Sequence, residues 1–129
     1  MKFIDQLKEK AKQNKKTIVL PETSDMRTIE AAGKVLAEGI ANIILVGDKE
    51  DIMSRAGDID LSGASFVDPK NYEKFDEYVD AFVEMRRKKG MTEARAKELL
   101  LTNPLYFGCM MVKQDDADGM VAGAIKVVG

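Results

Sequence analysis

The chain has 129 residues, of which 45% are hydrophobic and 33% are charged, and its formal net charge is -2. This length corresponds to one globular domain, and the slight negative charge argues against nucleic acid as a partner. The chain contains no histidine and only one cysteine. These counts exclude Ser-His-Asp chemistry and the common zinc sites, so we expect no metal.

The cellular setting is inferred from the same composition. A single cysteine cannot form an internal disulfide, which fits a reducing compartment. No apolar run reaches the about 20 residues that span a bilayer, and charges interrupt the apolar stretch of the first ten residues. We therefore expect a cytoplasmic protein that has no membrane partner and carries no secretory signal.

The first two predicted elements are a helix and a strand. Apolar residues at helical spacing predict an amphipathic helix over 2–14. A short β-branched run that ends at Pro21 predicts a strand over 17–20.

A second helix and a second strand follow. Thr23, Ser24 or Asp25 can cap the start of this helix. Gly39 is suited to its end. The run 40–46 is almost entirely apolar, as expected for a strand that is covered on both faces. Together with the first strand, these elements predict a strand–helix–strand unit.

The middle of the chain is predicted to contain a helix, a strand and a second helix, over 49–55, 64–67 and 72–83. A turn at Asp68 and Pro69 follows the strand. The second helix has the longest amphipathic stripe in the sequence. Four cations at 86–89 would complement its dipole, and Gly90 is suited to cap it.

The last third is predicted to contain two helices and a strand, over 92–101, 105–113 and 119–122. Asn103 is a capping residue, and Pro104 favours the first turn of the helix that follows it. The strand then enters a glycine-rich turn. The whole pattern predicts a single α/β domain over 1–129, with an open, mostly parallel sheet and helices in flanking layers.

Arg27 is the first candidate for a binding role. It lies in the first turn of a predicted helix, directly beyond a strand, where parallel sheets bind ligands and where backbone N–H groups attract anions. A guanidinium can also bind phosphate with two hydrogen bonds. From spacing alone, a surface ion pair with Asp25, Glu22 or Glu30 is the more common role of such a residue.

Arg86 is the second candidate. Neighbouring helical residues point about 100° apart, so the cations at 86–89 cannot all face one ligand. A solvated helix end is the more common role of such a run. Arg86 lies one helical repeat beyond Phe82 and Val83, at the border of the buried face, and could therefore reach into a cleft.

Three other features are interpreted mainly as structural. Cys109 lies in an apolar helical segment and is expected to be a buried thiol, because no neighbour in sequence would lower its pKa. Met110 and Met111 are expected in the core. Asp116 and Asp118 flank the last strand and are equally consistent with turn formation.

Several motifs follow one another in a fixed order along the chain. They occupy 18–28, 31–32, 39–47, 68–70, 78–90, 106–112 and 117–124. Together they resemble the amino-terminal part of the phosphate acetyltransferases (phosphotransacetylases) over residues 1–124. The Leu-Pro-Glu-Thr start and the Tyr-Phe-x-x-Met-Met block are more similar to these enzymes than to the related phosphate butyryltransferases.

The resemblance implies reversible transfer of an acetyl group between coenzyme A and phosphate, with acetyl phosphate as the other acyl compound. Coenzyme A would be a substrate, and no cofactor would be bound covalently. The implied fold is two α/β domains with the active site between them, usually in a homodimer. The implied mechanism is attack of the coenzyme A thiolate on the acetyl carbonyl, assisted by a carboxylate base and by arginines. Arg27 and Arg86 match family arginines assigned to coenzyme A or substrate binding.

The chain departs from the family pattern at its end. The family continues after residue 124 with a turn rich in His and Ser/Thr, whereas residues 125–129 are Ile-Lys-Val-Val-Gly. The segment that carries the family's catalytic Ser, Arg and Asp does not follow. We therefore expect a truncated first domain with no catalytic residue of its own and no activity alone. Surface left uncovered would favour a homo-oligomer.

Two other interpretations stay open. The chain could be a non-catalytic α/β module that binds an anionic ligand or a partner protein through the uncovered face. It could also be a structural remnant with no function of its own. Measurements of acetyl transfer and of coenzyme A binding would separate these interpretations.

Overall fold

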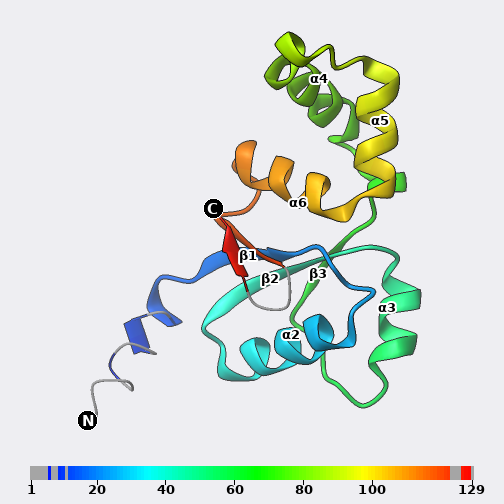
Figure 1. The fold of residues 1–129 in the computed structure, drawn as a ribbon. Helices are drawn as coiled ribbons and strands as arrows, with labels where there is room; N and C mark the ends of the chain where they lie inside the picture. The colour runs from blue at the N-terminus through cyan, green and yellow to red at the C-terminus, as the bar shows by residue number, and fades with distance from the viewer. Residues whose placement is uncertain (1–5, 7–8, 11, 123–125, 129) are drawn as a thin grey trace.

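The computed structural model describes residues 6, 9–10, 12–122 and 126–128. Its centre is a five-stranded sheet with the order β3-β2-β1-β4-β5 (Figure 1). The strands are β1 (Lys16–Leu20), β2 (Ala41–Val46), β3 (Ser65–Val67), β4 (Gly119–Ala122) and β5 (Lys126–Val128). The first four pair in parallel, and β5 runs antiparallel to β4. The predicted open, mostly parallel α/β fold is confirmed.

Helices form a layer on each face of the sheet (Figure 1). One layer contains α2 (Met26–Glu38) and α3 (Lys49–Ala56). The other contains α4 (Phe75–Met85), α5 (Glu93–Thr102) and α6 (Pro104–Lys113). Two short 3₁₀ helices, Pro69–Asn71 and Arg87–Lys89, precede and follow α4.

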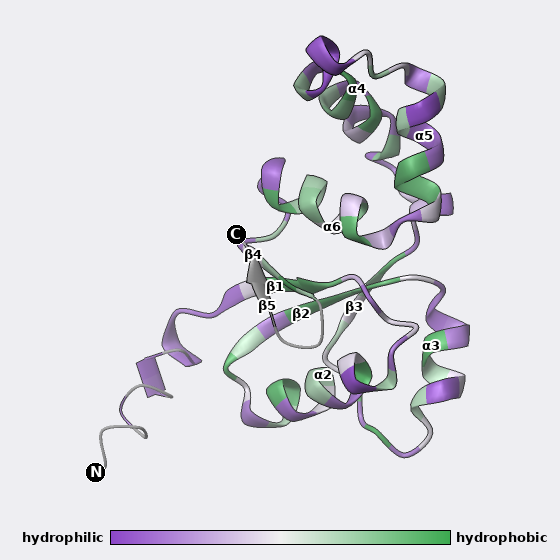
Figure 2. Cartoon of the chain, viewed as in Figure 1, coloured by the Kyte–Doolittle hydropathy of each residue, from purple (hydrophilic) through white to green (hydrophobic). Residues whose placement is uncertain are grey.

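Alternation along the strands explains why this sheet needs two helical layers. Ile43 and Leu45 pack with α2 and α3, whereas Ile44 and Val46 pack with α4 to α6. Successive strand residues point to opposite faces, so a strand with both faces covered must be apolar throughout. Figure 2 accordingly shows β1 and β2 mostly in hydrophobic colours, between helices that also carry hydrophilic residues. The sequence-based interpretation of 40–46 as a doubly covered strand is confirmed.

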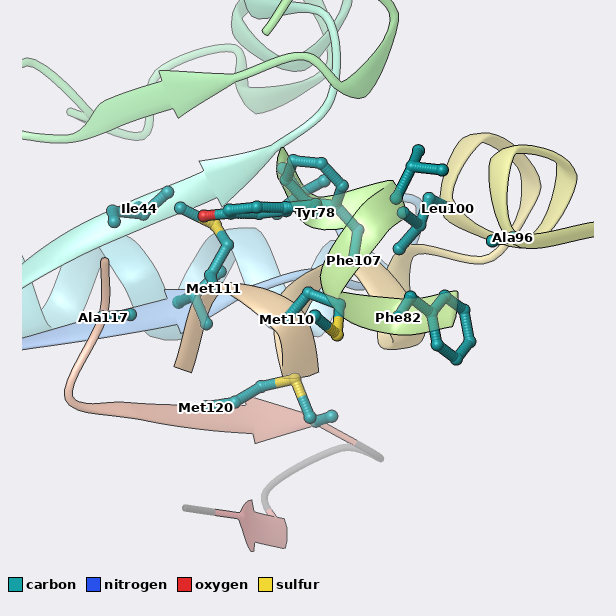
Figure 3. Close-up of a cluster of buried hydrophobic side chains, with 14 residues drawn as sticks. Ile44, Tyr78, Phe82, Ala96, Leu100, Phe107, Met110, Met111, Ala117 and Met120 are labelled. Carbon is teal, nitrogen blue, oxygen red and sulfur yellow. The ribbon is translucent and has the colours of Figure 1, made fainter. Parts of the chain in front are cut away.

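The core between the sheet and the α4–α6 layer is rich in aromatic and methionine side chains (Figure 3). The rings of Tyr78 in α4 and Phe107 in α6 have centroids 5.3 Å apart. Met110 and Met111 are almost fully buried, in the same cluster as Met120 of β4. The prediction that the methionine pair fills the core is confirmed.

The helix predicted from residue 72 to the cap at Gly90 is shorter than expected. α4 ends at Met85, and a separate 3₁₀ helix follows, which Gly90 terminates with φ 79°. The apolar stripe ends near Val83, so further α-helical turns would bury little. The tighter turn instead returns Met91 to the core.

The prediction of a buried Cys109 is wrong, because this side chain is exposed. α6 buries Phe107, Gly108, Met110 and Met111. Cys109 is two positions from Phe107, and a helical rotation of about 200° turns it to the opposite side. Partial burial still raises the pKa of its thiol.

The helix predicted over 2–14 falls partly outside the described residues. Residues 6, 9, 10, 12 and 13 are helical and exposed, whereas the apolar positions of the predicted stripe are not described. Within the described part of the chain, no helix combines the length and apolarity needed to cross a bilayer.

Candidate functional site

The strand order reverses between β1 and β4. The chain passes from β1 through β2 to β3 in one direction, and then returns to place β4 on the other side of β1. Helices that follow the strands on either side of such a point lead to opposite faces of the sheet, which opens a crevice at the carboxyl ends. A ligand site is therefore expected at the carboxyl end of β1.

The loop after β1 is held by hydrogen bonds to neighbouring elements. The Thr23 side chain is buried, and its Oγ1 donates to the carbonyl of Val46 at 2.6 Å. Arg55 of α3 donates from Nη1 to the carbonyl of Thr23 at 2.7 Å. Gly47 has φ 137°, and a Cβ there would lie 3.1 Å from Thr23 Oγ1. The loop therefore has a defined position relative to β2 and α3.

Asp25 and Arg27 form the start of α2 on this loop. Asp25 is the helix N-cap and accepts from the backbone N–H of Arg27 at 2.9 Å. Its carboxylate also accepts from Arg27 Nε, at 3.1 and 3.2 Å, and from Nη2 at 2.7 Å. Hydrogen bonds from Arg27 lower the pKa of Asp25, and the carboxylate raises the pKa of Arg27. The surface ion pair that spacing suggested is present, and the Arg27 side chain is 72% exposed.

Arg86 lies in the other helical layer. It is the C-cap residue of α4, it is half-buried, and its guanidinium carbon lies 5.9 Å from the centre of the Phe82 ring. Figure 1 places α2 and α4 on opposite sides of the sheet. No hydrogen bond, ion pair or ring contact between described residues joins Arg86 to Arg27. A shared binding role for the two arginines stays a prediction.

A cleft of about 350 Å³ adjoins the carboxyl ends of β1, β2 and β3. Residues after each strand line it, including Thr23, Gly47, Asp68 and Lys70, and the α5–α6 turn closes it on one side. This cleft was not predicted from the sequence. The available signal was polar or turn-forming residues after three successive strands, which parallel pairing brings to one edge.

A larger cleft of about 650 Å³ lies elsewhere, between α2 and the segment before β3. Gly33 and Ile59 are among its lining residues. It adjoins the amino end of β3, so it is not part of the crevice at the carboxyl ends.

Asp116 and Asp118 lie before β4, at the opposite edge from the candidate site. Asp118 exchanges two hydrogen bonds with Thr17, of 2.8 Å to its carboxylate and 2.7 Å from its N–H. Asp116 pairs with Lys74 and accepts from the hydroxyl of Tyr78. Both carboxylates therefore fix the start of β4. The described residues contain no group of three or more His, Cys, Asp or Glu side chains that could hold a metal.

The fold is that of an open, mostly parallel α/β protein with a cleft at the carboxyl ends of β1, β2 and β3. The family model described as "Phosphate acetyl/butaryl transferase" matches residues 2–128. The chain therefore belongs to the phosphate acetyl/butaryl transferase family.

Curated relatives and a solved structure agree with this assignment. The chain is 49% identical to the phosphate acetyltransferase of Acetivibrio thermocellus and 50% identical to that of Thermoanaerobacterium thermosaccharolyticum. These matches cover 98% and 97% of the chain, but in both cases 38% of the relative. The structure of EutD phosphotransacetylase from Staphylococcus aureus superposes with a TM-score of 0.80 at 38% identity, over 93% of this chain and 36% of that one.

Proposed function

We propose that this chain forms the part of a phosphate acetyltransferase that binds coenzyme A or phosphate, and that Arg27 and Arg86 are substrate-binding residues. The full reaction would transfer an acetyl group between coenzyme A and phosphate. The observation that carries the proposal is the position of Arg27, in the first turn of α2 beyond β1, within a chain that matches the family over residues 2–128.

In the proposed reaction, the main contribution of this part of the protein is positive charge. In one direction, a base takes the thiol proton of coenzyme A and the sulfur attacks the acetyl carbonyl of acetyl phosphate. A carbon–sulfur bond forms, the carbon–oxygen bond to phosphate breaks, and inorganic phosphate leaves. Guanidinium groups suit the phosphate oxygens and the transient oxyanion.

Arg27 and the start of α2 offer hydrogen-bond donors to such an anion. Its Nε and Nη2 hold the Asp25 carboxylate, which leaves the Nη1 donors directed away from that pair. The N–H groups at the start of α2 add a favourable field for negative charge. Asp25 would fix the guanidinium in one orientation, at the cost of part of its positive potential.

Arg86 would act from the other layer. Its guanidinium lies over the Phe82 ring, and the residue as a whole stays partly open to solvent. Arg87, by contrast, pairs with Glu84 and is exposed. We propose that Arg86 is the member of the basic run that binds ligand.

We further propose that these 129 residues do not catalyse acetyl transfer alone. The chain spans 38% of the length of each of the two curated relatives named above. The carboxylates of Asp48 and Asp68, which border the cleft, accept from the backbone N–H groups of Glu50 and Lys70 as helix caps. A base for the thiol would therefore have to come from other residues.

Coenzyme A binding to the purified chain tests this proposal. We expect binding by isothermal titration calorimetry, and a loss of affinity of about tenfold in Arg27→Ala and in Arg86→Ala. Arg95→Ala is the matched control, because Arg95 is an exposed arginine of α5 that pairs with Glu98. The same samples should show no acetyl transfer from acetyl phosphate to coenzyme A.

Two results would contradict the proposal. If coenzyme A does not bind at millimolar concentration, the chain has no residual site. If the purified chain transfers acetyl groups rapidly, the expectation that it lacks the catalytic groups is wrong.

A second candidate function is binding of a partner without catalysis. It is supported by apolar side chains on either side of the α5–α6 turn, where Leu101 and Leu105 are 43% and 37% exposed. We propose that a second copy of the chain, or another protein, covers this surface. The corresponding measurement is the oligomeric state.

A further inference from the structure

We propose that Arg55 of α3 is a positioning residue that sets the orientation of Arg27. This inference rests on the proposed binding role of Arg27. It concerns a residue that is 32 positions away from Thr23 in the chain and whose contacts were not visible in the sequence pattern.

The guanidinium of Arg55 joins α3 to the loop after β1. Its Nε and Nη2 donate to Asp51 Oδ2 at 3.1 and 3.0 Å, and its Nη1 donates to the carbonyl of Thr23 at 2.7 Å. Asp51 lies one helical turn earlier in α3, so it holds the planar group in place. A rigid, charged donor thereby fixes one backbone carbonyl of the loop.

That carbonyl belongs to the turn that carries Asp25. The N–H of Asp25 donates to the carbonyl of Glu22 at 3.1 Å, so residues 22–25 form a hydrogen-bonded turn with Thr23 inside it. Thr23 Oγ1 holds the same turn to Val46 of β2. The turn is therefore fixed at two points, one on the sheet and one on α3.

The position of the turn decides the position of Arg27. Asp25 contacts Arg27 through the backbone N–H, Nε and Nη2, so any displacement of its carboxylate displaces the guanidinium. Without Arg55, the Thr23 carbonyl loses its side-chain donor, and the connection of the turn to α3 through this hydrogen bond is lost. We expect the turn to move and Arg27 to sample several orientations, which raises the entropy cost of binding.

The Arg27 Nε–H resonance in NMR spectra of the free protein provides a direct test. A hydrogen bond to Asp25 should give the wild-type protein one sharp, shifted Nε–H signal. We expect Arg55→Ala to broaden this signal or move it towards the free-arginine position, and Asp51→Ala to do so more weakly. Arg95→Ala, which also removes an ion-paired arginine from a helix surface, should leave it unchanged.

Arg55→Lys is the control for a general loss of folding. Lysine keeps one donor for the Thr23 carbonyl but lacks the fork that Asp51 holds. We expect this variant to keep the wild-type fold in amide spectra, to restore part of the Arg27 signal, and to bind coenzyme A with an affinity between those of wild type and Arg55→Ala. For Arg55→Ala we expect about tenfold weaker binding.

The two proposals fail in different ways. An unchanged Arg27 Nε–H signal in folded Arg55→Ala overturns the positioning role, whatever the ligand does. Failure of the wild-type chain to bind coenzyme A overturns the proposed function, while the NMR comparison still decides the role of Arg55.

Discussion

At the residue scale, the ion pair between Lys74 and Asp116 connects a helical layer to the sheet. Lys74 occupies the N-cap position of α4, and its Nζ lies 2.6 Å from Asp116 Oδ1, just before β4. The Asp116 side chain is 17% exposed and also accepts from the Tyr78 hydroxyl. Burial raises the pKa of Tyr78, so the phenol stays a donor.

The ionisation of Asp116 favours the folded state. Burial opposes its charge, but the hydrogen bonds from Lys74 and Tyr78 outweigh this effect and lower its pKa. A carboxyl whose pKa is lowered by folding stabilises the protein above its unfolded pKa, about 3.9. That contribution is lost as the pH falls through the folded value.

We predict that Asp116→Asn lowers the free energy of unfolding by about 1–3 kcal/mol at neutral pH, because a charged acceptor of two hydrogen bonds is lost. The difference between variant and wild type should shrink below about pH 4. Urea unfolding followed by circular dichroism at several pH values measures it. Asp58→Asn, which changes an exposed loop carboxylate, is the control, and an equal pH dependence in both variants would contradict the prediction.

At the element scale, the close approach of α6 to β1 and β4 depends on a residue without a side chain. A Cβ at Gly108 would lie 2.7 Å from Met120 Sδ and 3.2 Å from Pro21 Cβ and Cγ. Pro21 is rigid and buried at the end of β1. The position of α6 therefore affects the position of Pro21, which leads from β1 into the loop of the candidate site.

We predict that Gly108→Ala lowers the free energy of unfolding by about 1–3 kcal/mol, because the added methyl overpacks the contact with Pro21 and Met120. Helix propensity alone would give the opposite sign, by about 1 kcal/mol in favour of alanine. The thermal unfolding midpoint distinguishes the two effects, because overpacking lowers it and higher helix propensity raises it. Cys109→Ala, one position along the same helix on its exposed side, should change stability by less than about 0.5 kcal/mol.

At the scale of the whole molecule, both helical layers leave some large apolar side chains exposed. Leu101 and Leu105, on either side of the turn between α5 and α6, are exposed. Leu101 also lines a cleft of about 440 Å³ together with Tyr72 and Phe75. Exposed leucines near aromatic residues are typical of a surface that binds another protein.

We predict that the chain self-associates at high protein concentration and that Leu101→Glu reduces this association, because a charge in the centre of an apolar contact must be desolvated. Size-exclusion chromatography with light scattering measures the mass. Met53→Glu in α3, which alters an exposed apolar residue of the other layer, is the control. A monomeric wild type at every concentration would show that this surface has no self-partner.

The sequence alone predicted the order and type of the elements from β1 to β4, but it predicted neither β5 nor the two 3₁₀ helices. The apolar run at 40–46, the cap at Gly39 and the Asn103-Pro104 start of α6 are local signals, and local physics decides them. The parallel sheet followed from the spacing of strands and helices. The family resemblance was also present in the linear motifs, and the match over residues 2–128 confirms it.

Other features required the tertiary structure. The exposure of Cys109 depends on which side of α6 meets the sheet, and a uniformly apolar segment does not indicate that side. Three further features depend on how segments distant in the chain are arranged in space. They are the contact of Arg55 with the Thr23 carbonyl, the cleft beyond β1 to β3, and the separation of Arg27 from Arg86. The sequence determined which residues could bind an anion, because side-chain chemistry is local. The structure decided which of them share a surface, because chain folding sets distances between remote residues.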